Sequence, residues 1–404
     1  MKDSLQKERL FKHFSAQNWY TQIEVPVFFR GGLDESRKLI TDVDVIALRP
    51  GRELRWELVL GDCKTLKGVS PANRAIWLRG LMDHFNATQG IILLKLRQNQ
   101  KIEPDHKRFA SSLNINLLDE NEFAQYDRAT VYPAGTSEYL DNCSDFQEIR
   151  LLPKKYPKLK HFVTYLIEGA WNEQSYFELL RSMIGEGKAI SKEIDPVKQN
   201  HLSLVLEASS MFAVGLAAST GILFNQYLQP DDMTQLDSAL KVNIWGGRSQ
   251  YKFYEKLRHE LLIAKGITDA KKVNELRLPH WDDFIQLVRN ILESPFLAFS
   301  VPQILRSAAI DVMGNRPFLE GSTVQQLSLL KIAMLVTKYY CYASSFPPDT
   351  VNILVKMFAD RQSFLVHKDA EETIVKQDDE NSNKSYKSKP GPAQKNLPGL
   401  NQDK

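Results

Sequence analysis

The chain has 404 residues, of which 43% are hydrophobic and 25% charged, an ordinary composition for a globular protein. Its 52 basic and 49 acidic side chains leave a formal net charge of +3. This near balance argues against a histone-like polybasic protein, so any affinity for nucleic acid must come from a local patch. The length suits two domains, or one large domain with an appendage.

The cysteines and the apolar runs point to a soluble cytoplasmic protein. Cys63, Cys143 and Cys341 are widely separated, and such a sparse, odd set suits a reducing compartment better than a disulfide framework. The N-terminal residues lack the apolar core of a signal peptide. The most apolar run, residues 211–224, contains two glycines and is too short to span a bilayer. We therefore expect no association with a membrane.

The N-terminal part mixes helical and strand patterns. We expect, in chain order, a helix at 5–15, strands at 19–29, 41–47 and 56–62, a helix at 72–87, a buried parallel strand at 90–94, a helix at 105–112 and a strand at 115–118. Pro50, Gly51 and Arg52 predict a turn that joins the second and third strands into an antiparallel hairpin. Pro26 removes one backbone donor, which favours a sheet edge for the first strand. The mixture predicts an α/β fold with helices against a central mixed sheet.

From about residue 154 the pattern changes to long apolar-periodic segments. Helices are expected at 159–171, 174–184, 201–227, 251–265, 280–292 and 324–342. Small residues between Gly215 and Gly221 predict close packing of one of these helices. The stretch from 369 onward has few large apolar residues and predicts a disordered tail. The expected organisation is therefore an α/β domain at 1–150, an all-α domain at 151–368 and a tail at 369–404.

Acidic side chains recur on two neighbouring predicted strands. Asp42 and Asp44 lie on the first, and the second ends in Asp62, Cys63 and Lys64. Because residues i and i+2 of a strand point to the same side, Asp62 and Lys64 converge on one volume. Carboxylates beside a lysine suit a Mg²⁺ site with a group that positions or activates water. An isolated Asp-x-Lys tripeptide is common, and acidic pairs on strands usually belong to a solvated face, but the helix–strand unit that follows favours the catalytic interpretation.

This order of elements resembles the PD-(D/E)xK nuclease superfamily, which includes restriction endonucleases and Holliday-junction resolvases. The resemblance covers about the first 120 residues and implies a restriction-endonuclease-like sheet. It matches Asp44 to the family's first metal-binding aspartate, and Asp62 and Lys64 to the acidic residue and lysine of its second motif. Glu8 matches a glutamate on the first helix, and Asp42 is a further acidic candidate. No proline precedes Asp44, a departure that the family often tolerates.

The resemblance implies hydrolysis of phosphodiester bonds with Mg²⁺ or Mn²⁺. The metal ligands would be Asp44, Asp62 and the backbone carbonyl of Cys63, with Glu8 and Asp42 available to complete the shell. Lys64 would orient the attacking water or lower its pKa. The resemblance favours DNA over RNA, and defence against foreign DNA as the setting.

Three basic residues follow the Asp-x-Lys motif. Lys67, Arg74 and Arg79 stand where phosphate contacts would be useful, and ordinary solvated helix charges explain them equally well. Because cleavage of a duplex usually takes two active sites, we expect a homodimer or larger complex, formed through the helical domain.

Two other functions stay open on the sequence alone. One is a catalytically inactive nuclease-fold protein that binds nucleic acid or serves in assembly, against which the retained Asp44, Asp62 and Lys64 argue. The other is a helical interaction protein whose N-terminal domain is incidental. The eight histidines show no paired zinc-ligand spacing, and no P-loop pattern is present.

Overall fold

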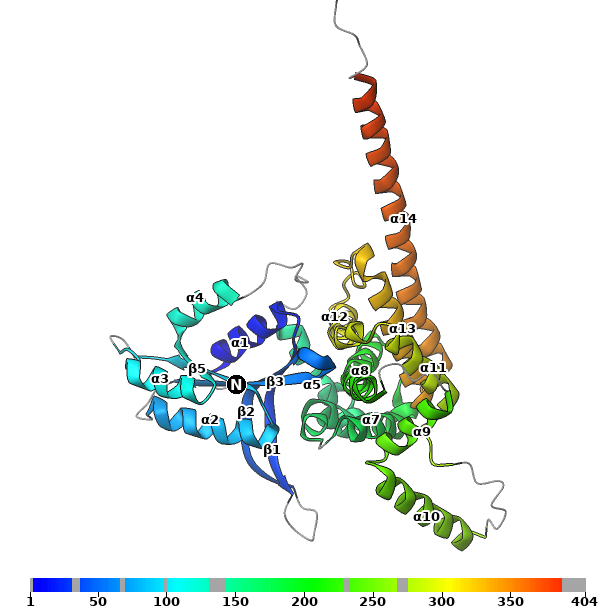
Figure 1. Ribbon diagram of the computed structural model, residues 1–404, viewed down its shortest axis with the longest axis horizontal. Coiled ribbons are helices and arrows are strands. Elements are labelled where there is room, and N and C mark those ends of the chain that lie inside the picture. Colours follow the sequence, from blue (N-terminus) through cyan, green and yellow to red (C-terminus); the bar gives the residue numbers. More distant parts are fainter. Residues whose placement is uncertain are drawn as a thin grey trace, which may run out of the picture.

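The structure is a computed structural model that describes residues 3–30, 37–65, 70–97, 100–130, 143–173, 175–227, 233–266 and 275–386. Its N-terminal half is an α/β unit, coloured blue to cyan in Figure 1. The elements are α1 (Ser4–Ala16), β1 (Tyr20–Arg30), β2 (Arg37–Pro50), the 3₁₀ turn η1 (Arg52–Leu54), β3 (Trp56–Thr65), α2 (Pro71–Phe85), β4 (Gln89–Lys95), α3 (Pro104–Ser112), β5 (Ile115–Asp119) and α4 (Glu120–Thr130).

The five strands form one mixed sheet in the order β1-β2-β3-β4-β5. The pairs β1–β2 and β2–β3 are antiparallel, whereas β3–β4 and β4–β5 are parallel. Helices α1 and α4 lie on one face of the sheet and α2 and α3 on the other (Figure 1). The predicted α/β fold, the hairpin, the parallel buried strand and the edge position of β1 are all confirmed.

Helix α2, which follows the Asp-x-Lys motif, packs closely on strand β4. A Cβ added to Gly90 would lie 2.9 Å from Leu78 and 3.0 Å from the sulfur of Met82, so α2 packs closely on β4. Leu78 and Met82 are both fully buried. Ile76, on the same helix, is 56% exposed. Ser70 stands at the N-cap with Pro71 in the first turn, although its side chain forms no capping hydrogen bond.

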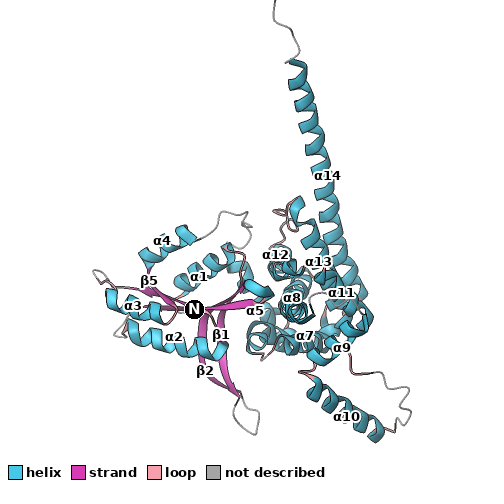
Figure 2. Cartoon of the chain, in the orientation of Figure 1, coloured by secondary structure: helices cyan, strands magenta, loops and turns pink. Residues whose placement is uncertain are grey.

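The second half contains only helices and turns among its described residues, as Figure 2 shows. They are α5 (Cys143–Lys155), η3 (Pro157–Leu159), α6 (Lys160–Thr164), the π-helical turn η4 (Tyr165–Gly169), η5 (Ala170–Asn172), α7 (Tyr176–Ile190), η6 (Ser191–Glu193), α8 (Gln199–Tyr227), α9 (Met233–Ile244), α10 (Arg248–Ala264), α11 (Trp281–Leu292), η8 (Pro295–Phe299), α12 (Val301–Met313), η9 (Val324–Gln326), α13 (Leu327–Ala343) and α14 (Pro348–Tyr386). The predicted all-α character is confirmed, and the boundary expected at residue 150 falls inside α5.

Helix α8 is the centre of the helical half. It contacts α7, α11, α12 and α13 and, within the described part of the chain, is the one helix long and apolar enough to cross a membrane. The apolar run at 211–224 is therefore part of a 29-residue helix rather than too short to span a bilayer. However, the apolar window of α8 is completely buried inside the protein, as expected for the core helix of a helical bundle.

Helix α14 leaves the body of the protein and extends far beyond it (Figure 1). It continues as a helix to Tyr386, into the stretch from residue 369 for which the sequence predicts a disordered tail. Residues 387–404, the rest of the predicted tail, lie outside the described part of the chain.

The helical half covers the free edge of β1. The guanidinium of Arg306 donates to the carbonyl of Thr21, and that of Arg150 to the carbonyl of Ile23. Asn172 Nδ2 donates to the carbonyl of Pro26 at 2.9 Å. Because an uncovered edge strand invites pairing with another chain, these contacts both join the two halves and protect the sheet.

The hairpin turn between β2 and β3 packs on α8. A Cβ added to Gly221 would lie 2.1 Å from the carbonyl oxygen of Leu54, so the helix backbone touches the turn directly. Asn225 Nδ2 donates to the carbonyl of Glu53 at 2.6 Å, and Trp56 Nε1 to that of Val214 at 3.0 Å. The predicted close packing of the small residues of α8 is confirmed, with the partner being the α/β half.

Candidate functional site

Two of the predicted acidic residues face each other across β2 and β3. Val45 pairs with Gly61 in the antiparallel register, so the next residues along the two strands, Asp44 and Asp62, point to the same face. Asp44 is 7% exposed and Asp62 is 1% exposed. Burial, and then the nearby negative charge of Asp62, raise the pKa of Asp44. The sheet thus holds two carboxylates close together with little contact to water.

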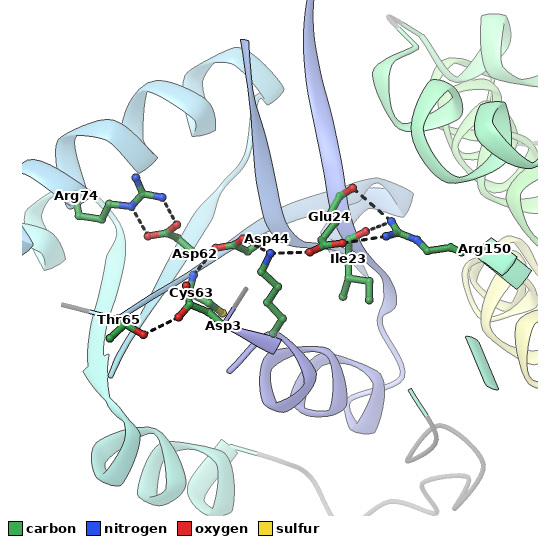
Figure 3. A network of polar contacts seen from close by, with 10 residues as sticks. Asp3, Ile23, Glu24, Asp44, Asp62, Cys63, Thr65, Arg74 and Arg150 are labelled. Atoms are coloured by element: carbon green, nitrogen blue, oxygen red, sulfur yellow. Dashed lines mark hydrogen bonds and ion pairs between the residues drawn. The ribbon is translucent and has the colours of Figure 1, made fainter. Parts of the chain in front are cut away.

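Both oxygens of Asp44 have partners from the protein. Lys7 Nζ lies 2.8 Å from Oδ1, and the backbone N–H of Cys63 donates to Oδ2 at 2.7 Å (Figure 3). Burial acts to lower the pKa of Lys7, but the hydrogen bonds and charges of Asp44 and Glu24 outweigh it and hold that pKa above its ordinary value. Lys7 is therefore a charged ammonium group inside the protein.

Asp62 is paired with Arg74 of α2. Arg74 Nε donates to Oδ2 at 2.6 Å, and a second nitrogen of the guanidinium donates to Oδ1. The guanidinium also lies over the ring of Trp77, 3.5 Å from its centroid. Such a bidentate pair is among the stronger charge-assisted contacts. Arg74, predicted to contact phosphate, instead neutralises a carboxylate of the site in this structure.

Lys64 is placed where the Asp-x-Lys spacing predicts. It is half-buried on β3, on the same face as Asp62 two residues earlier. Within the described part of the chain no residue forms a hydrogen bond or ion pair with Lys64. Its neighbour Thr65 donates to Asp3 Oδ1 at 2.6 Å, which ties the start of α1 to the end of β3. Lys64 thus shares a strand face with Asp62 and, among the described residues, forms an ion pair with neither carboxylate.

The remaining predicted residues are not brought to this cluster. Glu8 has a side chain that is 41% exposed and pairs with Lys12, one turn along α1, at 3.1 Å. Asp42 is exposed on β2 and lies outside the contacts that the described residues form around Asp44. Arg79 pairs with Asp83. Lys67 lies outside the described residues.

Glu24 of β1 is a site residue that the sequence reasoning missed. It lies between the pairs Ile23–Val45 and Val25–Val43 of the β1–β2 ladder, and therefore beside Asp44. Its carboxylate accepts from Lys7 at 2.9 Å and from Arg150 of α5 at 3.3 Å (Figure 3). Its φ of 51° is in the left-handed region, which a residue with a side chain adopts only when the surroundings hold it there.

The sequence pattern around Lys7 and Glu24 could have identified them as residues of the site. At helical spacing Lys7 falls on the face of Leu10, Phe11 and Phe14, all of which are buried. A lysine on such a face needs a carboxylate partner. The alternation of β1 likewise places Glu24 between buried Ile23 and Val25. The first helix does contribute to the site, but through Lys7 rather than Glu8.

The charged side chains of the cluster can be compared with the ligands that a Mg²⁺ ion requires. The cluster contains three carboxylates and three cations, namely Asp44, Asp62 and Glu24 with Lys7, Arg74 and Arg150. Among the described residues no group of three or more His, Cys, Asp or Glu side chains is arranged to hold a metal ion. A Mg²⁺ ion needs only one or two carboxylates with retained waters.

The backbone of Cys63 supplies a further oxygen to the same place. Its N–H points to the β2 side and bonds Asp44. Because the N–H and C=O of one strand residue project to the same edge, the Cys63 carbonyl also faces that side. Asp44, Asp62 and this carbonyl are hard oxygen donors of the kind that Mg²⁺ or Mn²⁺ takes, and in this structure Lys7 and Arg74 are bound to the two carboxylates.

Comparison of the chain with protein-family models, with curated proteins and with solved structures finds no match.

Proposed function

We propose that the protein is a Mg²⁺- or Mn²⁺-dependent nuclease of the restriction-endonuclease-like type, which hydrolyses phosphodiester bonds, most readily in DNA. The observation that carries the proposal is the meeting of Asp44 and Asp62 on adjacent strands. Lys64 lies on the same face of β3 as Asp62 and is unpaired among the described residues. The order of elements, a helix, three strands, a helix and a parallel strand, agrees with the resemblance that the sequence motifs suggest.

The residues of the site would divide the work as follows. Asp44, Asp62 and the Cys63 carbonyl would hold the divalent ion. When bound, the ion would stabilise negative charge on the phosphate and lower the pKa of a water. Lys64 lies on the face of β3 that also carries Asp62, and from there its ammonium group would orient the attacking water or stabilise charge that develops on the phosphate oxygens.

The helical half would serve substrate choice or assembly. Cleavage of both strands of a duplex would use two copies of the site, and a homodimer or larger complex through the helical half would supply them. A cytoplasmic role in defence against foreign DNA remains part of this proposal.

Cleavage assays with matched variants test the proposal. The purified chain is incubated with single-stranded, duplex and branched DNA and with RNA, in Mg²⁺, in Mn²⁺ and with a chelator. Asp62→Ala and Lys64→Ala should each reduce divalent-dependent cleavage at least a hundredfold, because each removes a group that acts on the metal or the water. Lys331→Ala, an exposed lysine of α13, should leave the rate unchanged.

Circular dichroism melting shows whether each variant is folded. Cleavage that persists in folded Asp62→Ala and Lys64→Ala would contradict the proposal.

A specific observation favours a second candidate, a nuclease fold without activity. All four oxygens of Asp44 and Asp62 already have protein partners. In that case the cluster would be a structural ion-pair network, and the protein would bind nucleic acid or serve in assembly. Calorimetry that detects no binding of Mn²⁺, to the natural chain or to a variant without Lys7, would favour this candidate.

A further inference from the structure

The ammonium group of Lys7 occupies the position of a cation between two carboxylates. It lies 2.8 Å from Asp44 and 2.9 Å from Glu24, and the residue is only 5% exposed. Lysine is almost never buried unless paired, so this arrangement holds a positive charge at the carboxylate to which the proposed function assigns a metal. Figure 3 shows Arg74, Asp62, Asp44, Glu24 and Arg150 side by side in that order.

A divalent ion and Lys7 would need the same oxygen. The other oxygen of Asp44 accepts the backbone N–H of Cys63, a residue that is held in the central strand β3 by its pairing with β4. An ion bound at Oδ1 within about 2 Å would therefore stand close to the ammonium nitrogen, where like charges repel strongly. The ion and the ammonium exclude each other at Asp44.

We propose that Lys7 is an internal competitor for the metal. It neutralises Asp44 while no divalent ion is bound, and it moves onto Glu24 alone when one binds. The inference rests on the metal site of the proposed function. Lys7 is thus a positioning residue, which acts through Asp44 and sets the concentration of metal at which the site fills.

Glu24 makes this exchange possible because it offers the ammonium a second carboxylate. Its side chain is 30% exposed. Glu24 can therefore pair with the displaced ammonium without burying another charged group. Arg150 bonds its carboxylate and the backbone carbonyls of Ile23 and Glu24. A helix of the second half therefore fixes the acceptor of the displaced lysine.

Binding of Mn²⁺ alone, measured by calorimetry on the full chain without nucleic acid, tests the inference. Lys7→Met should bind Mn²⁺ at least tenfold more tightly than the natural chain, because the competing cation is gone. Glu24→Gln should bind it several-fold more weakly, since the displaced ammonium loses its acceptor. Lys12→Met, an exposed lysine of the same helix, should leave the affinity unchanged.

The two variants change the affinity in opposite directions, which a general loss of structure would not do. If Lys7→Met does not fold, Glu24→Gln carries the test, and Mn²⁺ should raise the melting temperature of that variant less than that of the natural chain. An affinity of folded Lys7→Met equal to or weaker than that of the natural chain, or a tighter Glu24→Gln, overturns the inference.

The result of the Mn²⁺-binding test can be distinguished from the result of the cleavage assays. Opposite shifts in Mn²⁺ affinity without any cleavage of nucleic acid would uphold the competition and refute the nuclease. Cleavage with unchanged affinity in folded variants would uphold the nuclease and refute the competition. No binding of Mn²⁺ to any variant, Lys7→Met included, refutes both.

Discussion

Each half of the protein contains a buried carboxylate that pairs with an arginine. Asp62 is 1% exposed and meets Arg74, and Asp311 of α12 is fully buried. Asp311 accepts the backbone N–H of Leu319 at 3.0 Å and lies 3.4 Å from Arg316 Nε. Asp62 has two strong charge-assisted contacts, whereas Asp311 has one backbone hydrogen bond and a long contact to Arg316.

The pH dependence of stability at Asp311 can be predicted with its sign. Burial raises the pKa of Asp311 from 3.8 to about 6. The folded state therefore favours the protonated form, and this contribution is complete below pH 3.8 and is lost as pH rises through 6.

Urea unfolding of the natural chain and Asp311→Asn at several pH values checks this prediction. Because asparagine stays neutral, the free energy of unfolding of the variant, relative to that of the natural chain, should rise between pH 4 and pH 8 by up to about 3 kcal/mol. A difference that is independent of pH would contradict the prediction.

At the residue scale the sequence motifs located half of the candidate site. Asp44, Asp62 and Lys64 follow from strand alternation, which is a local property. Lys7, Glu24 and Arg150 are brought to Asp44 by tertiary packing, and Arg150 is 126 residues from Glu24 in the sequence. The resemblance implies Glu8 because it is the acidic residue of the first helix, whereas the apolar face of α1 passes through Lys7.

At the scale of elements, α8 and the hairpin turn pack with their backbones in close contact. This contact depends on Gly221, because a Cβ there would lie 2.1 Å from a backbone oxygen of Leu54, which cannot move as a flexible side chain would. Three hydrogen-bonding and packing contacts from one helix therefore fix the position of the turn beside it.

Substitution of Gly221 tests this contact. Gly221→Ala should lower the free energy of unfolding by about 1–3 kcal/mol, since the added methyl group forces α8 and the turn apart. Gly185→Ala in α7 is the matched control, because a Cβ there meets nothing within 4 Å, and it should stabilise the chain by about 0.5–1 kcal/mol. The measurement is urea denaturation, and equal effects of the two substitutions would refute the interpretation.

Helices α4, α5, α9, α12 and α14 were not predicted from the sequence. Helix α4 has one buried residue, Phe123, and therefore lacks an apolar stripe. Helix α5 contains Pro153, a residue that usually ends a helix. Helix α14 has a hydrophobic pattern confined to its first half, so its continuation to Tyr386 has no periodic signal. Strongly periodic elements such as α11 were predicted to within a residue.

At the scale of the whole molecule, a buried ionic network joins the two halves. Arg306 of α12 is 1% exposed and bonds Glu207 of α8 at 3.0 Å. Tyr20 of β1 donates to the same Glu207 at 3.2 Å, and its ring lies 3.6 Å from the Arg306 guanidinium carbon. These residues come from three distant parts of the sequence, so no local pattern predicts that they meet.

Removal of one partner of this network should be strongly destabilising. Arg306→Met leaves Glu207 charged and buried without its cation, and it should cost about 3–5 kcal/mol of the free energy of unfolding. Arg306→Met combined with Glu207→Leu should recover most of that loss, since no unpaired charge remains. Calorimetric melting of the three proteins checks this, and a double variant no more stable than the single one would contradict it.

The covered edge of β1 has a consequence for the synthesis and folding of the protein. The carbonyl of Thr21 finds its partner in Arg306, 285 residues later. At a synthesis rate of about 5–20 residues per second, the ribosome exposes this edge for roughly 15–60 s before the partner is made. An unprotected strand edge is a template for association with neighbouring nascent chains. Production of this protein in cells is therefore expected to depend on chaperones that shield the sheet until the last helices emerge.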